Sequence, residues 1–587
     1  MESIVTEYAN RALAFRAMQD ATVRNGNQYL WKDQDKPNSL PETILPAGGF
    51  YNTQTRTMES YDFRASATYN TTLNNDHIIN TYLGSEVNSQ DRVSRWMDGW
   101  GMQYDSGLTP FWDYRAFKRL TEKNWDYYGL SKSFGRSVAF FANATYSYKG
   151  RYTITGTTRY EGTNRLGRTR KARWLPTWNI SGAWNAHSED FFEKQHLLSH
   201  LTLKGSYSLV GVAPSWVTNS RAIIYSRAAW RPSAGQSENR NYIGSFENED
   251  LTYEKKHELN FGVDMGLLKN RLNIAADIYW RNNFDLIGAA YTIGGTRWGN
   301  VASMKSHGFE LSVSTKNIQS KDFSWTTDFI FGSTFNKVTE LDTKRNMFNF
   351  LTGNGFARQG YPVRSLFSIP FTGLDDEGFP TFMVNGKQVT RRNYRDINFQ
   401  QVDDLDFLKY EGSSEPTYNG SFGNIFTFKN FKLNVFITYS GGNKLRLDPS
   451  FYAAYSDLWA TPKEYRNRWT TLGDERKTDI PVIASVRDHY SYSNLGTGYA
   501  AYNYSTARVA DGSFIRLKEV SLTYTLPTPL IKRLGFLKSA SFKVQATNLA
   551  LLYADKKLYG QDPEFFRSGG VAAPLPKQVT ATVHIGF

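Results

Sequence analysis

The last twelve residues, Pro576-Lys577-Gln578-Val579-Thr580-Ala581-Thr582-Val583-His584-Ile585-Gly586-Phe587, alternate between apolar and polar side chains from Val579 onward. Successive side chains of a β-strand point to opposite faces, so one face of this strand is apolar and the other is polar. A half-buried strand of a soluble sandwich would show the same alternation. A long series of such strands that ends on an aromatic residue, here Phe587, is typical of a transmembrane β-barrel.

The same alternation recurs along most of the chain. Residues 259–267 and 272–280 both alternate, and only the hairpin-sized turn Leu268-Lys269-Asn270-Arg271 separates them. The pattern predicts about fifteen antiparallel strands, at 60–72, 76–88, 136–148, 151–162, 176–187, 199–210, 254–267, 269–284, 305–316, 323–337, 415–428, 431–444, 512–526, 536–550 and 576–587.

Short turns and long loops follow one another between these predicted strands, as they do in bacterial barrels with short periplasmic turns and long extracellular loops. The chain therefore divides into a barrel region, 60–587, and a preceding region, 1–59. We expect 1–59 to be one extracellular loop with a weakly helical stretch near 4–18. The long extracellular loops are predicted at 89–135, 211–253, 338–414, 445–511 and 551–575.

The number and direction of the predicted strands indicate a larger barrel. Both ends of such barrels lie in the periplasm, so the last strand runs from the outside to the periplasm. With fifteen alternating strands, the first predicted strand runs in the same direction, although the first strand of a complete barrel would start in the periplasm. An odd number of strands would also leave an edge that lipid does not tolerate. We therefore expect this sequence to hold the later part of a barrel. Its first residues lack the basic and apolar segments of a signal peptide, so we expect that any export signal was removed or belongs to a longer chain.

Composition agrees with this fold and excludes several other classes. The 587 residues include no cysteine, so there are no disulfides or thiolate metal sites. The mean hydropathy is −0.52, which suits a barrel because only alternate residues face lipid. The formal net charge is +14, but the chain has no dense basic run or zinc spacing. We therefore expect no nucleic-acid partner.

The sequence contains no recognisable catalytic or metal-binding motif. His196 and His200 have a spacing that suits a metal only on a helix, and we expect them in a periplasmic turn. Asp375-Asp376-Glu377-Gly378 lacks the alternating ligands of a calcium loop, so we interpret it as a turn. The sequence predicts no enzyme, no metal and no cofactor.

Several motifs occur in the order found in one transporter family. The segment from Asp511 to Pro527, DGSFIRLKEVSLTYTLP, resembles the late-barrel signature of SusC/RagA-type TonB-dependent transporters of Bacteroidetes. The segments 248–254 (NEDLTYE), 375–378 (DDEG) and 560–564 (GQDPE) resemble further motifs of the same family. One departure is Glu161, where the family more often has aspartate.

This resemblance implies a fold, a function and partners. The fold would be about the last fifteen strands of a 22-stranded outer-membrane barrel, with no plug domain in this chain. The function would be uptake of nutrients, either oligosaccharides or peptides, across the cell outer membrane. The implied partners are a SusD-like surface lipoprotein that acts as a lid, the TonB–ExbB–ExbD system acting through the plug, and the membrane lipid itself. The alternative is a scaffold or binding component of a surface complex that transports nothing.

The long loops contain the candidate site residues. Aromatic side chains can stack on sugar rings or on peptide side chains, although they can equally pack the loops together. The substrate-binding candidates are Trp112, Tyr114, Trp459, Tyr465, Trp469 and Tyr490. A hairpin around Asn385-Gly386, with Phe382 on its first strand, is predicted to contact the lid. We expect Phe587 to be the signal for barrel assembly.

Overall fold

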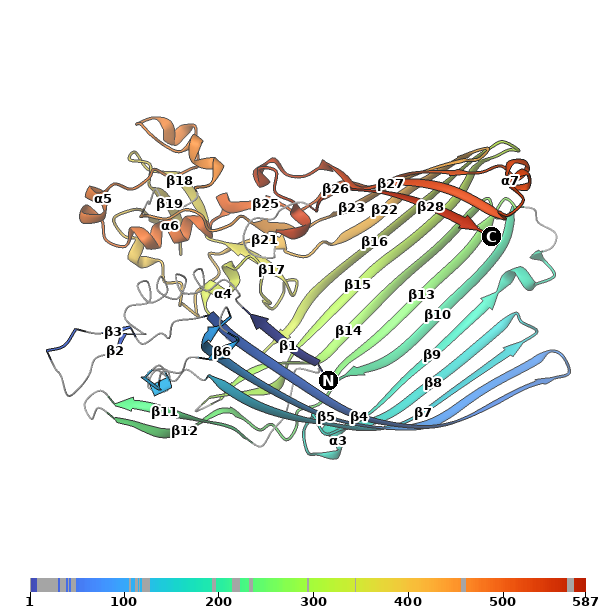
Figure 1. The fold of residues 1–587 in the computed structure, drawn as a ribbon, viewed down its shortest axis with the longest axis horizontal. Helices are drawn as coiled ribbons and strands as arrows, with labels where there is room; N and C mark the ends of the chain where they lie inside the picture. The colour runs from blue at the N-terminus through green and yellow to red at the C-terminus, as the bar shows by residue number, and fades with distance from the viewer. Residues whose placement is uncertain are drawn as a thin grey trace.

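Fifteen long strands make up the body of the structure, a computed structural model, and cross Figure 1 as one curved fan. They are β4 (Gly49–Leu73), β5 (His77–Gln103), β7 (Tyr128–Tyr148), β8 (Tyr152–Thr163), β9 (Trp174–Asn185), β10 (Leu198–Val212), β13 (Glu254–Leu267), β14 (Leu272–Thr292), β15 (Gly295–Gln319), β16 (Phe323–Leu341), β22 (Tyr418–Phe428), β23 (Phe431–Gly441), β26 (Phe514–Thr525), β27 (Ser539–Tyr553) and β28 (Gln578–Gly586). The structure describes residues 2–7, 30–31, 38–40, 42–43, 49–104, 107–110, 114–115, 117–118, 127–192, 197–213, 222–231, 236–292, 295–343, 345–454, 461–566 and 575–587.

Each long strand is antiparallel to the next one along the chain, in an unbroken series of registered pairs from β4 to β28. Among the described residues the sheet contains 19 strands. Its other members are β1 (Glu2–Glu7), β6 (Thr109–Pro110), β11 (Ala222–Arg231) and β12 (Gln236–Phe246), and the last two lie in the region 211–253 that was predicted to be a loop. The predicted number and order of the long strands are confirmed.

Several strands are longer than the sequence predicted. β4 begins at Gly49 and β5 continues to Gln103, so strands occupy parts of the regions 1–59 and 89–135 that were predicted to be loops. β1 likewise covers the start of the stretch predicted to be helical at 4–18, and the rest of that stretch lies outside the described residues. Polar residues occupy both faces of β4 near Thr53 and Gln54, so no alternation marks the strand there. The backbone ladder between strands needs no apolar face, which is why the strands extend beyond the predicted ends.

The two faces of the sheet differ in polarity as predicted. On one face, apolar side chains lie opposite one another across neighbouring strands. One such row contains Phe261, Ile278 and Phe309, and another contains Leu433, Leu522, Val544 and Ala581. On the other face, Arg281 donates to Glu258 at 3.0 Å, and Arg159 pairs with both Glu86 and Glu161.

Helices are short and lie between strands. Within the described residues they are α3 (Arg170–Arg173), α4 (Met347–Leu351), α5 (Val486–Ser491), α6 (Leu495–Asn503) and α7 (Thr528–Leu534). No helix among the described residues is long and apolar enough to span a membrane. The last residue, Phe587, is 73% exposed, and its role as an assembly signal stays a prediction.

Candidate functional site: a cap built from two loops

Two of the predicted long loops fold together into one body at the end of the sheet (Figure 1). We call residues 345–413 and 444–511 the cap. The first segment contains β17 (Ser365–Ser368), β18 (Phe371–Leu374), β19 (Pro380–Val384), β20 (Lys387–Val389) and β21 (Lys409–Ser413), and the second contains β24 (Lys444–Arg446) and β25 (Val509–Asp511). The Ile369 amide donates to Tyr504 O at 3.0 Å, and the Thr506 amide donates to Ile369 O at 3.0 Å. The two loops therefore share backbone hydrogen bonds.

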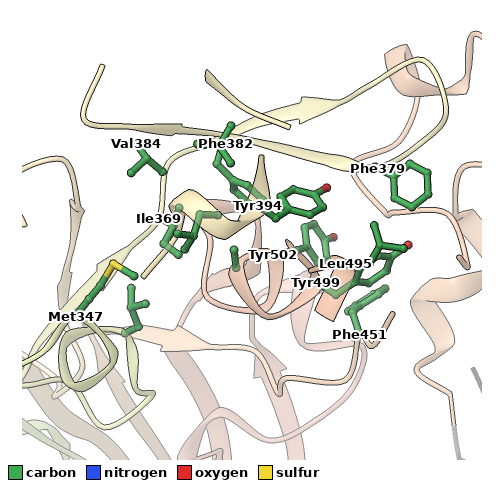
Figure 2. Packing of buried hydrophobic residues seen from close by; sticks show 14 of the residues in the cluster. Met347, Ile369, Phe379, Phe382, Val384, Tyr394, Phe451, Leu495, Tyr499 and Tyr502 are labelled. Carbon is green, nitrogen blue, oxygen red and sulfur yellow. The ribbon is translucent and has the colours of Figure 1, made fainter. Parts of the chain in front are cut away.

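Aromatic and aliphatic side chains from both segments form the core of the cap. Phe382 and Tyr394 come from the first segment, while Tyr499 and Tyr502 come from helix α6 in the second; all four are nearly or fully buried. Figure 2 shows the three tyrosine rings close together in the middle of this cluster. Burial raises the pKa of all three tyrosines above the usual range, so their hydroxyls stay neutral. The cap is thus a packed body with a core that both segments share.

Arg446 connects the two segments inside the cap. Its guanidinium donates to Ser505 O at 2.8 Å, to Phe367 O at 2.5 Å and to Ser368 Oγ at 3.0 Å. Desolvation lowers the pKa of this arginine to about 9. Because it donates hydrogen bonds to backbone carbonyls of both segments, Arg446 links the two segments to each other.

The acidic segment 375–378 forms a turn, as predicted. Asp375 Oδ1 accepts from the amides of Glu377 and Phe379, at 3.0 and 2.9 Å. Arg391 pairs with Asp375, with Asp376 at 3.3 Å and with Glu377 at 2.8 Å. Desolvation opposes the charge of Arg391, but its hydrogen bond to Tyr492 and its pairing with Asp375 outweigh this effect and raise its pKa. The carboxylates therefore have a cationic partner within the protein.

The predicted hairpin is present as β19 and β20. Its turn residues Asn385 and Gly386 both have positive φ, 48° and 74°, as a two-residue hairpin turn requires. Phe382, however, is fully buried in the cap core and offers nothing to a partner. The alternation of the strand turns Phe382 and Val384 inward and Met383 outward, so a role of Phe382 in partner binding would be to support the hairpin from within. Asn385 and Gly386 are exposed and remain candidates.

Two of the aromatic candidates are packed within the cap. The Tyr465 ring lies 4.8 Å from the Phe451 ring, centroid to centroid. Trp469 covers Gly378, where an added Cβ would lie 2.5 Å from the indole, and its Nε1 donates to Glu475 at 3.1 Å. For these two residues the structure favours the packing alternative over direct substrate contact.

The other aromatic candidates differ in their surroundings. Tyr490 is 88% exposed and Tyr114 is 74% exposed, so both rings are available to a ligand. Trp112 and Trp459 lie outside the described residues. The structure therefore leaves Tyr490 as the accessible candidate on the cap.

Two polar hollows were not predicted from the sequence. One, of about 500 Å³, lies between the cap and residues 557–559, and its lining includes Arg468, Lys477, Asp479, Arg508 and Tyr559. The other, of about 520 Å³, includes Arg136, Arg159, Glu161, Arg165 and Tyr253 in its lining. Groups of both charges suit polar ligands with several hydrogen-bonding groups. Residues far apart in the sequence line each hollow, so no sequence motif or alternation could have predicted them.

The described residues contain no group of three or more histidine, cysteine, aspartate or glutamate side chains placed to hold a metal ion. His200 was predicted to lie in a turn but is part of β10, where it lies beside Asn270 and close to His187. His196 lies outside the described residues.

Comparison with known proteins identifies the family. Residues 6–447 match the family model described as TonB dependent receptor-like, beta-barrel. The chain belongs to this family. Its members are transporters and receptors of the bacterial outer membrane, so the predicted fold and location are confirmed.

Two curated relatives show how much of a longer protein this chain represents. TonB-dependent receptor P39 of Formosa agariphila is 24% identical over 91% of this chain, which covers 53% of that receptor. TonB-dependent receptor SusC of Bacteroides thetaiotaomicron is 26% identical over 35% of this chain and 21% of its own length. The chain spans about half the length of the P39 receptor.

Solved structures show the same architecture. The structure of the RagAB peptide transporter matches 92% of this chain and 56% of its own chain, with a TM-score of 0.71 and 22% identity. The RagAB peptide importer in its closed-closed state gives a TM-score of 0.72, also at 22% identity. At this identity the likeness establishes the fold alone. The family match, the SusC relative and this shared fold together confirm the predicted SusC/RagA-type barrel.

Proposed function

We propose that this barrel belongs to a transporter that imports oligosaccharides or peptides across the outer membrane with energy from TonB. The observation that carries this proposal is the sheet itself, with one apolar face, one charged face and a rigid cap at one end. A wall of this type separates lipid from a polar lumen. The relatives named as TonB-dependent receptors support the energy source, and RagAB is named as a peptide transporter.

The cap suits selection of the substrate. It carries the exposed aromatic ring of Tyr490 and, separately, a hollow whose lining includes Arg508 and Tyr559. Such groups bind sugars or peptides by stacking and by directional hydrogen bonds.

Uptake by intact bacteria that express the full-length protein tests the transport proposal. We expect accumulation of a labelled oligosaccharide or peptide mixture to stop when TonB is removed, because a closed transporter needs energy to open. Accumulation that continues at the same rate without TonB would contradict energised transport. No accumulation in either strain would favour the scaffold alternative.

We also propose that a SusD-like lipoprotein contacts the exposed tip of the β19–β20 hairpin. The substitution Met383→Asp should reduce co-purification of the lipoprotein at least fivefold, because it adds a charge beside the turn and leaves the buried Phe382, Val384 and Val389 in place. Co-purification from detergent extracts measures the effect.

The matched control is Leu472→Asp, which adds a charge at another exposed cap position. Equal recovery of the lipoprotein with the hairpin variant, the control and the unmodified protein would exclude the hairpin tip from the interface. Protease resistance of the cap in both variants would show that its core remains folded.

A further inference from the structure

A row of polar and basic residues crosses the apolar face at one level. The register places His257 of β13, Asn282 of β14, Lys305 of β15 and Lys337 of β16 opposite one another in succession. The row ends at the apolar Leu209 of β10, which lies opposite His257. The next row toward the turns consists of Leu259, Trp280, His307 and Phe335. Trp280 is 45% exposed and Phe335 is 47% exposed, and the His307 ring stacks on Phe335 at 5.6 Å.

The basic row lies at the height where an apolar band of ordinary thickness would end. Lys305 is ten residues from Thr315 along β15. Thr315 pairs with Leu272, which lies beside the turn 268–271 between β13 and β14. Ten residues of strand span about 33 Å, and a tilt of about 40° reduces this to about 25 Å across the membrane, the usual height of the apolar band. Aromatic residues mark the same boundary in membrane proteins.

Lys305 and Lys337 face each other directly across the strand pair. Like charges in this position repel and destabilise a sheet. Within the described part of the chain neither lysine has an ion-pair partner, whereas nearby Lys255 pairs with Asp285 at 2.7 Å. The carboxylate of Glu340, beyond the two lysines, accepts from Ser303 at 2.9 Å. Two cations therefore lie opposite each other at the membrane boundary, and no carboxylate of the described residues is paired with either of them.

We propose that Lys305 and Lys337 bind a phosphate group of an outer-membrane lipid, with Asn282 beside them. A phosphate between the two ammonium groups would replace their repulsion by two charge-assisted hydrogen bonds. The flanking His307 and Phe335 rings would contact the upper part of the acyl chains. A lipid fits better than a free anion because the site opens toward the membrane boundary and continues into the apolar face. This inference needs only the membrane location and does not depend on transport.

Binding of lipid A to the purified full-length protein in neutral detergent tests the proposal. The probe is bisphosphorylated lipid A, with dephosphorylated lipid A and inorganic phosphate as comparisons. We expect the double variant Lys305→Ser and Lys337→Ser to bind bisphosphorylated lipid A about tenfold more weakly than the unmodified protein. The matched control Lys321→Ser removes a lysine from the turn at the opposite end of the same hairpin and should bind as the unmodified protein does.

A second variant tests the repulsion itself. Lys337→Glu places a carboxylate opposite Lys305, so it should raise the melting temperature in neutral detergent. We expect bisphosphorylated lipid A to raise the melting temperature of the unmodified protein but not that of this variant. Equal lipid A affinity in the double serine variant and the unmodified protein would overturn the proposal. An equal rise in the melting temperature of the unmodified protein with inorganic phosphate would also overturn it, because this result indicates a free-anion site. An equal rise with dephosphorylated lipid A would overturn it as well, because this result indicates acyl-chain binding alone.

Discussion

Replacing Asp562 by alanine should destabilise the protein by about 3–5 kcal/mol, because it leaves a buried arginine without its main partner. Asp562 is fully buried and Arg516 of β26 is 3% exposed. One guanidinium nitrogen of Arg516 donates to both carboxylate oxygens at 2.6 Å. Asp562 also accepts from the Glu564 amide at 3.1 Å, so the substitution loosens the turn at 563–565 as well. Urea unfolding in lipid or detergent measures the loss.

Two controls separate the charge pair from simple loss of packing. Arg516→Leu combined with Asp562→Leu removes both charges, and we expect it to be more stable than Asp562→Ala alone. Glu564, which lies 3.2 Å from Arg516, should limit the loss toward the lower end of the range. A free energy of unfolding within about 0.5 kcal/mol of the unmodified protein would show that the pair does not hold this segment to β26.

The strands could be predicted because lipid and lumen impose a strict pattern on them. Leu272, Ile274 and Ile278 alternate with Asn273 and Asp277, and the register confirms that the two sets lie on opposite faces. Where both faces meet water, the pattern ends although the strand continues. For this reason the sequence predicted β4 and β7 to begin later, and β5 to end earlier, than they do in the structure.

The cap could not be predicted in the same way. Asn385-Gly386 correctly indicated a hairpin because local backbone geometry decides a two-residue turn. That Phe382 is buried depends on its packing against Tyr394, which is 12 residues away, and on helix α6, which is more than a hundred residues away. The bonds of Arg446 to Phe367 and Ser505 also join distant segments. Aromatic residues in a loop therefore could not be divided into packing and binding groups from the sequence alone.

Replacing Ile278 by arginine should cost about 2–4 kcal/mol, because the register places this residue midway along the apolar band. Ile278 lies between Phe261 and Phe309 in its row and is 40% exposed on the apolar face. Ile274 is four residues nearer the turn, so Ile274→Arg should cost less. Reversible unfolding of the full-length barrel in phospholipid vesicles measures both values.

The adjacent residue provides the matched control. Asp277 points to the opposite face and pairs in register with Glu310 of β15. Asp277→Arg should cost less than about 1 kcal/mol, because the new cation lies opposite a carboxylate and replaces a like-charge contact. An equal cost at positions 277 and 278 would mean that the sheet does not separate lipid from lumen at this level. A greater cost at 277 would mean that the two faces are assigned the wrong way round.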